Sequence, residues 1–375
     1  MRAPRRLVLR RAFTYEHKRL SAIADREKKI MDTKITKKRL AAMLSYDWLK
    51  IVALIIALIF VWSLIFTTTA TRITAAQQFT VFNYWSNGPL GGKFNTTFAT
   101  AKENIFSYEV LETTYTDLST MGDTAATVLQ ARSSVAEGDL VFVPKIDDKS
   151  YIKTPAKDEN NDGVEEVPAT YFSHLETFVS SYAYSLYDLN PETQDGYFKS
   201  MESYLNTYYN GDWENGTLNE QKVKDDFVAR ITANGDKRFK KSEQIEQGKL
   251  DEIERIQKYN AALKQFYGWY DEGAIQAEKI TLQYQNGETF EGYFALNLCP
   301  TTTGKTQKLW NYFYYYEEKI EENGTTSYPK SSKDMCVCFF KFDQVEKGFE
   351  YESLLFLNYL INACIELDQE SQVNP

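Results

Sequence analysis

The stretch AEGDLVFVP, Ala136 to Pro144, gives the best indication of the fold. It runs from a predicted helix end through a glycine and an acid into a short strand that is wholly apolar. A strand without polar alternation is typical of a parallel sheet covered on both faces. We therefore expect Asp139, at the start of the strand, to be structural, and the residues from Pro144 to Asp147 to be candidates for a site.

Two more strands and two helices are predicted before this stretch. The run FTVFNYW, Phe79 to Trp85, is of strand type, and residues 93–106 show helical spacing. A second strand is expected at residues 107–115 and a second helix at residues 123–138. Strand, helix, strand, helix, strand predicts a βαβαβ unit, with parallel pairing and right-handed crossovers.

The remainder of the chain is predicted to be helical in the middle and α/β at the end. Helical spacing covers residues 171–189 and much of residues 219–270. Strands are expected at residues 288–298, 308–319 and 335–342, with a hairpin turn at Asn323-Gly324 and a closing apolar helix at residues 351–367.

An uncharged apolar run, Ile51 to Phe66, divides the chain. With its flanks it reaches about 20 residues, enough for a hydrocarbon core of about 30 Å. The first 50 residues carry 15 Lys/Arg against 5 Asp/Glu, whereas residues 51–375 carry 28 against 47. The positive-inside rule thus predicts a single-pass protein of the cell membrane, with its N-terminus in the cytoplasm and an extracytoplasmic C-terminal domain. A cleaved signal peptide is the alternative.

These boundaries predict five segments. They are a basic extension at residues 1–30 (with Met31 as the expected start of translation), a cytoplasmic juxtamembrane segment at 31–47, a transmembrane helix at 48–70, a linker at 71–78, and an extracytoplasmic domain at 79–375. The four cysteines all lie in the last quarter, where disulfides are permitted. Cys336 and Cys338 would share one face of a strand, and their spacing fits no metal framework.

The arrangement "SYEVLETTYTDLST…VLQARSSVAEGDLVFVP", together with "EGYFALNL" and "MCVCFFKF…YESLLFLNYLI", resembles the extracellular solute-binding proteins of bacterial ABC importers. The likeness covers most of residues 79–367. It implies an α/β fold of the periplasmic-binding-protein type (type II), with two lobes that close on a ligand. Members of that family are typically lipoproteins or freely secreted, so a transmembrane anchor makes this chain a variant.

The strand ends of such a fold build its ligand site. Three groups of candidates follow the three predicted strands in turn: Trp85, Ser86 and Asn87; Thr116 and Asp117; Lys145 and Asp147. An exposed indole could stack on a flat ligand face, with amide and carboxylate groups fixing its polar atoms. The alternative is that Trp85 belongs to the core and the others are solvated turn residues.

Other kinds of chemistry find less support. DENNDG, Asp158 to Gly163, matches the first half of a calcium loop, but Ala169 stands where a bidentate Glu is needed. The Tyr-rich run at residues 311–319 suits either carbohydrate stacking or a hairpin strand. His174 is the one histidine after the span, so the sequence offers little support for a histidine-based catalytic triad. A glycosidase needs only a pair of carboxylates, so this class of enzyme remains an alternative. The acidic outer domain would repel nucleic acid.

The sequence therefore predicts a membrane-anchored, non-enzymatic protein without a cofactor or a metal. It would capture a small ligand, such as a carbohydrate, for an ABC transporter, with the permease subunits as further partners. The alternative is an interaction or sensing module of the cell envelope, which would use the same fold without transporting anything.

Overall fold

The computed structural model describes most of the chain as two separate units. The described residues are 36–38, 40–41, 48–69, 73–87, 102, 104–157, 167–283, 288–300, 307–317, 319–322, 325–342 and 348–373. The first unit ends at Arg72 and the second comprises Ile73 to Pro375. The predicted calcium loop and the first thirty residues lie mostly or wholly outside the described residues, so both remain predictions.

The first unit contains one long apolar helix, α3, at Trp48–Thr69. Its segment Trp48–Phe66 has a mean hydropathy of 2.8 and is not buried by other parts of the chain. Length and composition therefore permit it to cross a membrane, as the hydropathy pattern predicts.

The second unit is a mixed α/β structure built on one six-stranded sheet. Its strand order is β2-β1-β3-β12-β7-β6. The strands are β1 at Gln78–Asn83, β2 at Glu112–Asp117, β3 at Leu140–Pro144, β6 at Gln276–Gln283, β7 at Thr289–Asn297 and β12 at Met335–Phe339. The predicted α/β class is thereby confirmed.

The first three strands are parallel, as the βαβαβ pattern predicts. In the register, Val81 of β1 lies opposite Tyr115 of β2 on one side and Leu140 of β3 on the other. The strand predicted at residues 107–115 begins later, at Glu112, and the predicted helix at residues 123–138 is shorter. Most of the first predicted helix, residues 93–106, lies outside the described residues.

The order of the last three strands could not be read from the pattern. β12 inserts between β3 and β7 and is antiparallel to both, and β6 and β7 form an antiparallel pair at the far side of the sheet. Cys336 of β12 lies opposite Val143 of β3, which brings a segment near the end of the chain to the centre of the sheet.

Both faces of the sheet are buried, because alternate side chains of each strand join different apolar clusters. On β3, Leu140 and Phe142 face one cluster, whereas Val141 and Val143 face the other. Cys336 and Cys338 both face the second cluster, as their spacing predicts, and none of the four cysteines forms a disulfide. The wholly apolar sequence of β3 follows from this double burial.

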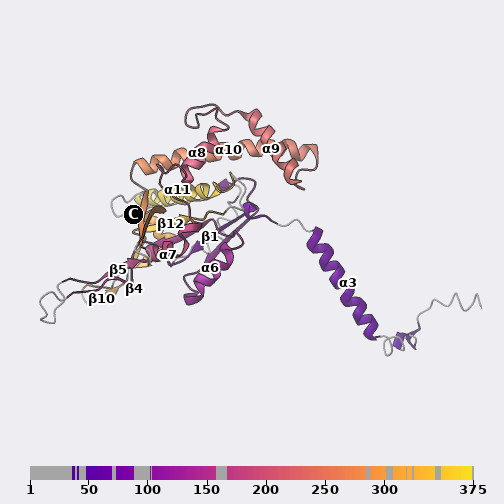
Figure 1. Cartoon of the computed structure of the whole chain (residues 1–375), viewed down its shortest axis with the longest axis horizontal. Helices are drawn as coiled ribbons and strands as arrows, with labels where there is room; N and C mark the ends of the chain where they lie inside the picture. Colours follow the sequence, from indigo (N-terminus) through magenta and orange to yellow (C-terminus); the bar gives the residue numbers. More distant parts are fainter. Residues whose placement is uncertain are drawn as a thin grey trace, which may run out of the picture. The chain divides into compact units, whose positions relative to one another are not determined.

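Helices cover both faces. α11 and α10 contribute to the first cluster, and α6 and α7 to the second. Figure 1 shows α11 over one face, with α8, α9 and α10 beyond it, and α6 and α7 on the other. The helices are α6 at Ala125–Ser133, α7 at His174–Tyr182, α8 at Tyr197–Asn206, α9 at Glu220–Asn234, α10 at Ser242–Asp271 and α11 at Glu352–Val373.

Local signals explain several helix ends. Ser173 and Glu176 form a reciprocal capping box at the start of α7. The Asn219 side chain accepts a hydrogen bond from the backbone of Lys222 at the start of α9, and Gly235 ends that helix in the left-handed region (φ 59°). The helix predicted over residues 171–189 is wrong at both ends, because its first residues belong to β5 and the segment after Ser185 is extended.

Three short antiparallel pairs complete the second unit. β4 at Asp147–Thr154 pairs with β5 at Thr170–Ser173, β8 at Tyr315–Tyr316 with β11 at Lys330–Ser331, and β9 at Ile320–Glu322 with β10 at Thr325–Ser327. Figure 1 shows β4, β5 and β10 extending away from the helices. The strand predicted at residues 308–319 is wrong in its first half, where Gln307–Asn311 forms a 3₁₀ helix.

Candidate functional site

The carboxyl ends of the parallel strands meet at one edge of the sheet, here called the carboxyl edge. Asn83, Asp117, Pro144 and Asn297 end β1, β2, β3 and β7 at this edge, and the antiparallel strands β12 and β6 begin there. In the order β2-β1-β3, the chain passes from β1 to β2 on one side and then crosses back to β3 on the other side of β1. Such a switch point, between β1 and β3, is where open α/β sheets commonly bind ligands.

The turn after β1 is fixed by a buried amide. The Asn83 side chain accepts hydrogen bonds from the backbone N–H (3.1 Å) and hydroxyl (2.6 Å) of Ser86, and it donates to Asp117 Oδ1 (3.2 Å). Asp117 Oδ1 also accepts from the hydroxyl of Ser119, at 2.5 Å. Ser86 is buried, so of the predicted candidates Ser86 and Asp117 serve chiefly to shape this turn.

This turn presents Trp85 to solvent. The Trp85 side chain is 47% exposed and stacks on the His174 ring with 4.2 Å between centroids. His174 Nδ1 lies 3.1 Å from Asp148 Oδ2, and its backbone N–H bonds to the carbonyl of Ile146, just after β3. The indole is therefore held in place by the segment that follows β3, and it is not a core residue.

His174 is held as a neutral ring near pH 7. Burial lowers its pKa below the ordinary value, and the Asp148 carboxylate offsets only part of this effect. A neutral imidazole keeps one nitrogen as an acceptor and one as a donor, so the ring can support the indole and still bond a polar ligand atom.

The remaining predicted candidates have different surroundings. Asn87 is exposed, and its backbone exchanges two hydrogen bonds with Tyr314, at 2.7 and 3.0 Å. Thr116 is half-buried within β2, next to β1. Asp147 is exposed and lies opposite Ser173 in the β4–β5 pair. The structure thus brings Trp85, Asn87 and the residues after β3 to one place, while Asp147 points its charge into solvent.

Lys145 lies in a polar chain that crosses three strands. Its ammonium is 2.6 Å from Glu278 Oε2 of β6. Asn297 of β7 donates to Glu278 Oε1 (2.8 Å) and to Asp334 Oδ1 (2.9 Å), just before β12. Partial burial lowers the pKa of Lys145, but Glu278 more than offsets this, and the pKa lies above its ordinary value. The lysine is therefore a fixed positive charge beside the switch point.

Sequence reasoning missed His174, Asp148, Glu278 and Asn297. Asp148 could have been found from the two-residue period of a strand, because Asp147 and Asp148 must face opposite sides of β4. The other three follow the end of β3 by 30 to 153 positions, and nothing local marks them as neighbours of Trp85 or Lys145. His174 is recognisable only after α7 is known to begin at this edge.

A second group of charged side chains, most of them buried, lies before β2, at the opposite edge; we call it the buried ion network. Its members are Glu109, Arg230, Arg238, Glu252, Arg255 and Glu352. Arg255 is only 2% exposed in its side chain, pairs with Glu252 at 2.6 Å, and also donates to Tyr204 and to the carbonyl of Gly348. Its ring of partners satisfies every guanidinium N–H, so the network has no donor left on Arg255 for a ligand.

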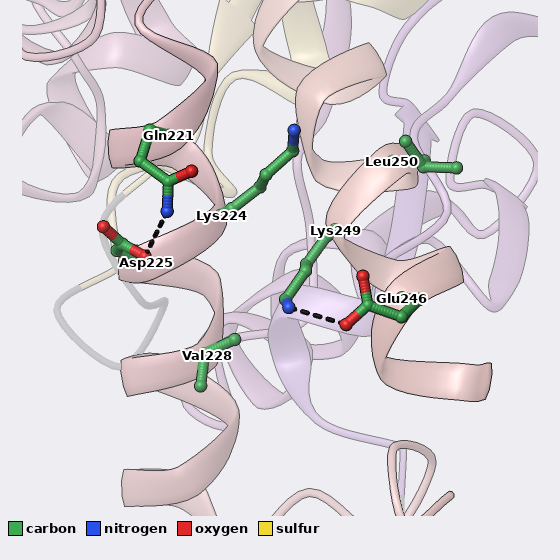
Figure 2. Close-up of a pocket in the computed structure, with 7 residues that line it drawn as sticks. All are labelled: Gln221, Lys224, Asp225, Val228, Glu246, Lys249 and Leu250. Atoms are coloured by element: carbon green, nitrogen blue, oxygen red, sulfur yellow. Dashed lines mark hydrogen bonds and ion pairs between the residues drawn. The ribbon is translucent and has the colours of Figure 1, made fainter. Parts of the chain in front are cut away.

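A shallow pocket of about 590 Å³ lies between α9 and α10 (Figure 2). Its polar groups are engaged along their own helices, since Gln221 donates to Asp225 (2.8 Å) and Lys249 pairs with Glu246 (2.7 Å). Lys224 pairs with Glu220, also on α9. Such pairs are the ordinary i, i+3 and i, i+4 contacts of a solvated helix surface, and they do not indicate a site.

Among the described residues, no group of three or more His, Cys, Asp or Glu side chains is placed to hold a metal ion. Comparisons with known proteins add no assignment: no family model, no curated protein and no solved structure matches this chain.

Proposed function

We propose that the chain is a membrane-tethered ligand-binding protein, whose binding site lies at the carboxyl edge of the sheet. The observation that carries this proposal is the exposed Trp85, held against His174 at the switch point between β1 and β3. An aromatic surface that is kept rigid and open beside fixed polar groups is the usual composition of a small-molecule site.

The site favours a ligand with a flat or ring-shaped apolar face and polar substituents. Trp85 offers the stacking surface, and Lys145 supplies a positive charge beside Glu278. A carbohydrate meets these requirements. Two predictions rest on the resemblance: that the two lobes close on the ligand, and that the protein presents it to the permease subunits of an ABC importer. The extracytoplasmic orientation rests on the charge distribution, and all three remain predictions.

The test is ligand-induced stabilisation of the full-length protein in lipid nanodiscs, screened against sugars, amino acids and short peptides. We expect one class to raise the melting temperature of the wild type. The Trp85→Phe variant should fold normally and lose most of that shift, because the smaller ring presents less surface for stacking.

Trp310→Phe is the matched control. Trp310 is similarly exposed, at 39%, but lies in the 3₁₀ helix before Tyr312, so its replacement should leave the ligand shift unchanged. Equal loss of the shift in both variants, or no stabilisation by any class, would contradict a site at Trp85.

The second candidate function is a docking module of the cell envelope. It is favoured by the exposed apolar side chains on the two projecting hairpins, which are Tyr151, Ile152, Phe172, Ile320 and Tyr328. Exposed aromatics on a projecting element are typical of protein interfaces. Absence of ligand binding, combined with crosslinking of the hairpins to one envelope protein in native membranes, would select this function over the first.

A further inference from the structure

An open pocket of about 560 Å³, called the cavity below, lies on the surface of the helical layer, at a place that no sequence pattern indicated. Its volume is within the range of about 300–1,000 Å³ that is usual for small-molecule sites. It is lined by Lys199 and Glu202 of α8, by Trp213, Glu214 and Asn215 of the following loop, and by Lys264, Tyr267, Gly268 and Asp271 of α10.

Two aromatic rings form one wall of this cavity. Trp213 and Tyr267 stack with 5.7 Å between their centroids and 29° between their planes. The Tyr267 hydroxyl donates to Glu202 Oε1 at 2.5 Å, and Lys199 holds the same carboxylate at 3.1 Å. The backbone of Trp213 is tied to Asn206 and Asn260. The rings are therefore fixed by hydrogen bonds before any ligand arrives, which lowers the entropic cost of binding.

Several polar groups of the wall have no partner among the described residues. The indole N–H of Trp213, the Lys264 ammonium and the Asp271 carboxylate form no hydrogen bond or ion pair there. Lys264, Tyr267, Gly268 and Asp271 follow the i, i+3, i+4, i+7 spacing, so they share one face of α10. The cavity thus offers both free donors and free acceptors beside a fixed aromatic pair.

Gly268 lies at the exposed surface of this pocket, so a side chain there would enter it. A glycine inside a helix costs about 1 kcal/mol relative to alanine, so it usually has a packing reason. Gly248 of the same helix has one, because a Cβ there would come within 2.4 Å of the Phe227 ring. At Gly268 a Cβ would meet nothing within 4 Å. The missing methyl group relieves no clash, so Gly268→Ala adds a methyl group to the open space of the pocket without disturbing its walls.

We propose that this cavity is a second binding site, and that it takes a neutral oligosaccharide. Sugar hydroxyls both donate and accept, which suits a wall that carries an ammonium, a carboxylate and an indole N–H together. The apolar face of a pyranose ring stacks on aromatic rings such as the Trp213–Tyr267 pair. Charges of both signs, from Lys264 and Asp271, line the pocket, so it does not select for a net charge on the ligand. The proposal does not depend on the site at Trp85.

The experiment is isothermal titration of the full-length protein in nanodiscs with maltotriose, cellotriose and chitotriose. We expect one of these to bind. Gly268→Ala should raise the melting temperature of the unliganded protein by about 1–3 °C, because it removes the cost of a helical glycine. The same variant should weaken binding at least about tenfold, because the new methyl group enters the space that the ligand would fill.

Three further variants separate this site from the one at the carboxyl edge. Trp213→Phe removes the indole N–H and should also weaken binding, whereas Trp85→Phe should leave it unchanged. Gln257→Ala, on the exposed surface of α10, is the control for a change of helix propensity outside the cavity. A ligand lost in Trp85→Phe but retained in Gly268→Ala would assign the sugar to the carboxyl edge and overturn the proposal.

Two other results would also overturn it. A lower melting temperature for Gly268→Ala would mean that the backbone or its packing requires the glycine. Absence of binding by all three trisaccharides would exclude neutral oligosaccharides as the ligand class, whatever the outcome at Trp85.

Discussion

The two edges of the central sheet both hold buried polar residues, but they use them differently. At the edge before β2, the buried ion network joins α9 to α10 through Arg230–Glu252 and α10 to α11 through the hydrogen bond from Tyr259 to Glu352. At the carboxyl edge the corresponding pair, Lys145–Glu278, keeps its lysine 44% exposed. One edge pairs its charges with one another inside the fold, whereas the other keeps a charge and an indole within reach of a ligand.

The difference in burial between the two edges indicates where a fold of this kind can hold a binding site. Charges that are fully enclosed must be completely paired, because an unpaired buried charge costs several kcal/mol. Charges at a partly open edge can leave one side free, since water satisfies it until a ligand arrives. Burial therefore distinguishes the two edges better than residue type does.

The largest expected effect comes from removing the cation of each pair. Arg255→Met leaves Glu252 buried beside Arg230 alone and should lower the free energy of unfolding by about 3–5 kcal/mol. Lys145→Met should cost only about 1 kcal/mol, because water can reach the freed carboxylate from the open side. Urea denaturation of both variants measures the two costs. Equal costs would show that the carboxyl edge is as closed as the ion network.

Asp139 provides a pH-dependent comparison within the same sheet. The pKa of the Asp139 carboxyl is raised to about 8, mainly by burial and to a smaller extent by the nearby Glu352. The hydrogen bond from the Thr80 backbone N–H (2.7 Å) opposes this rise. Because the folded pKa exceeds the unfolded one, the folded state holds an extra proton between about pH 4 and pH 8. Its contribution to stability is present below pH 4 and is lost as the pH rises to 8.

Asp139→Asn keeps an acceptor for Thr80 and removes this titration. We expect the variant to unfold like the wild type at pH 4 and to be more stable than it at pH 8, by about 1 kcal/mol or more. Chemical denaturation at both pH values measures the difference. Asp147→Asn, at the exposed start of β4, is the control and should leave stability within about 0.5 kcal/mol at either pH.

The smallest expected effect is the titration of His174. Its pKa is lowered by burial, so its folded state resists protonation and stability declines as the pH falls below about 6.5. NMR of the imidazole signals should give a midpoint below that value, and a His17→Gln variant assigns the two histidines. Asp148→Asn should lower the midpoint further, since it removes the carboxylate that favours the charged ring. A midpoint above 6.5 would contradict a ring buried against Trp85.

Local sequence was sufficient for part of the fold and for part of the candidate site. The parallel strands β1, β2 and β3 follow from short apolar runs, but the helix stop predicted at Gly138 is wrong, because α6 ends at Ser133 and Gly138 leads into β3. Gly138 has φ 136°, and a Cβ there would come within 2.5 Å of Phe82. Trp85 and Lys145 could be proposed because they come directly after two of those strands.

The failures occur where tertiary contacts override local preference. Residues 308–319 alternate like a strand, yet Leu309 and Phe313 are buried in the core and the first turn is helical. Residues 171–173 continue a helical pattern in sequence but pair with β4. In both places a neighbour from another part of the chain supplies the hydrogen bonds or the apolar contact that decides the backbone.

The sequence by itself determined the apolar helix α3, the α/β class and the double burial of β3, because hydropathy and periodicity are properties of contiguous residues. Only the tertiary structure decided that β12 enters the centre of the sheet, that His174 supports Trp85, and that Glu278 meets Lys145. The β3–β12, Trp85–His174 and Lys145–Glu278 pairings join residues 89 to 199 positions apart, and the packing of the whole domain, rather than any local preference, selects them.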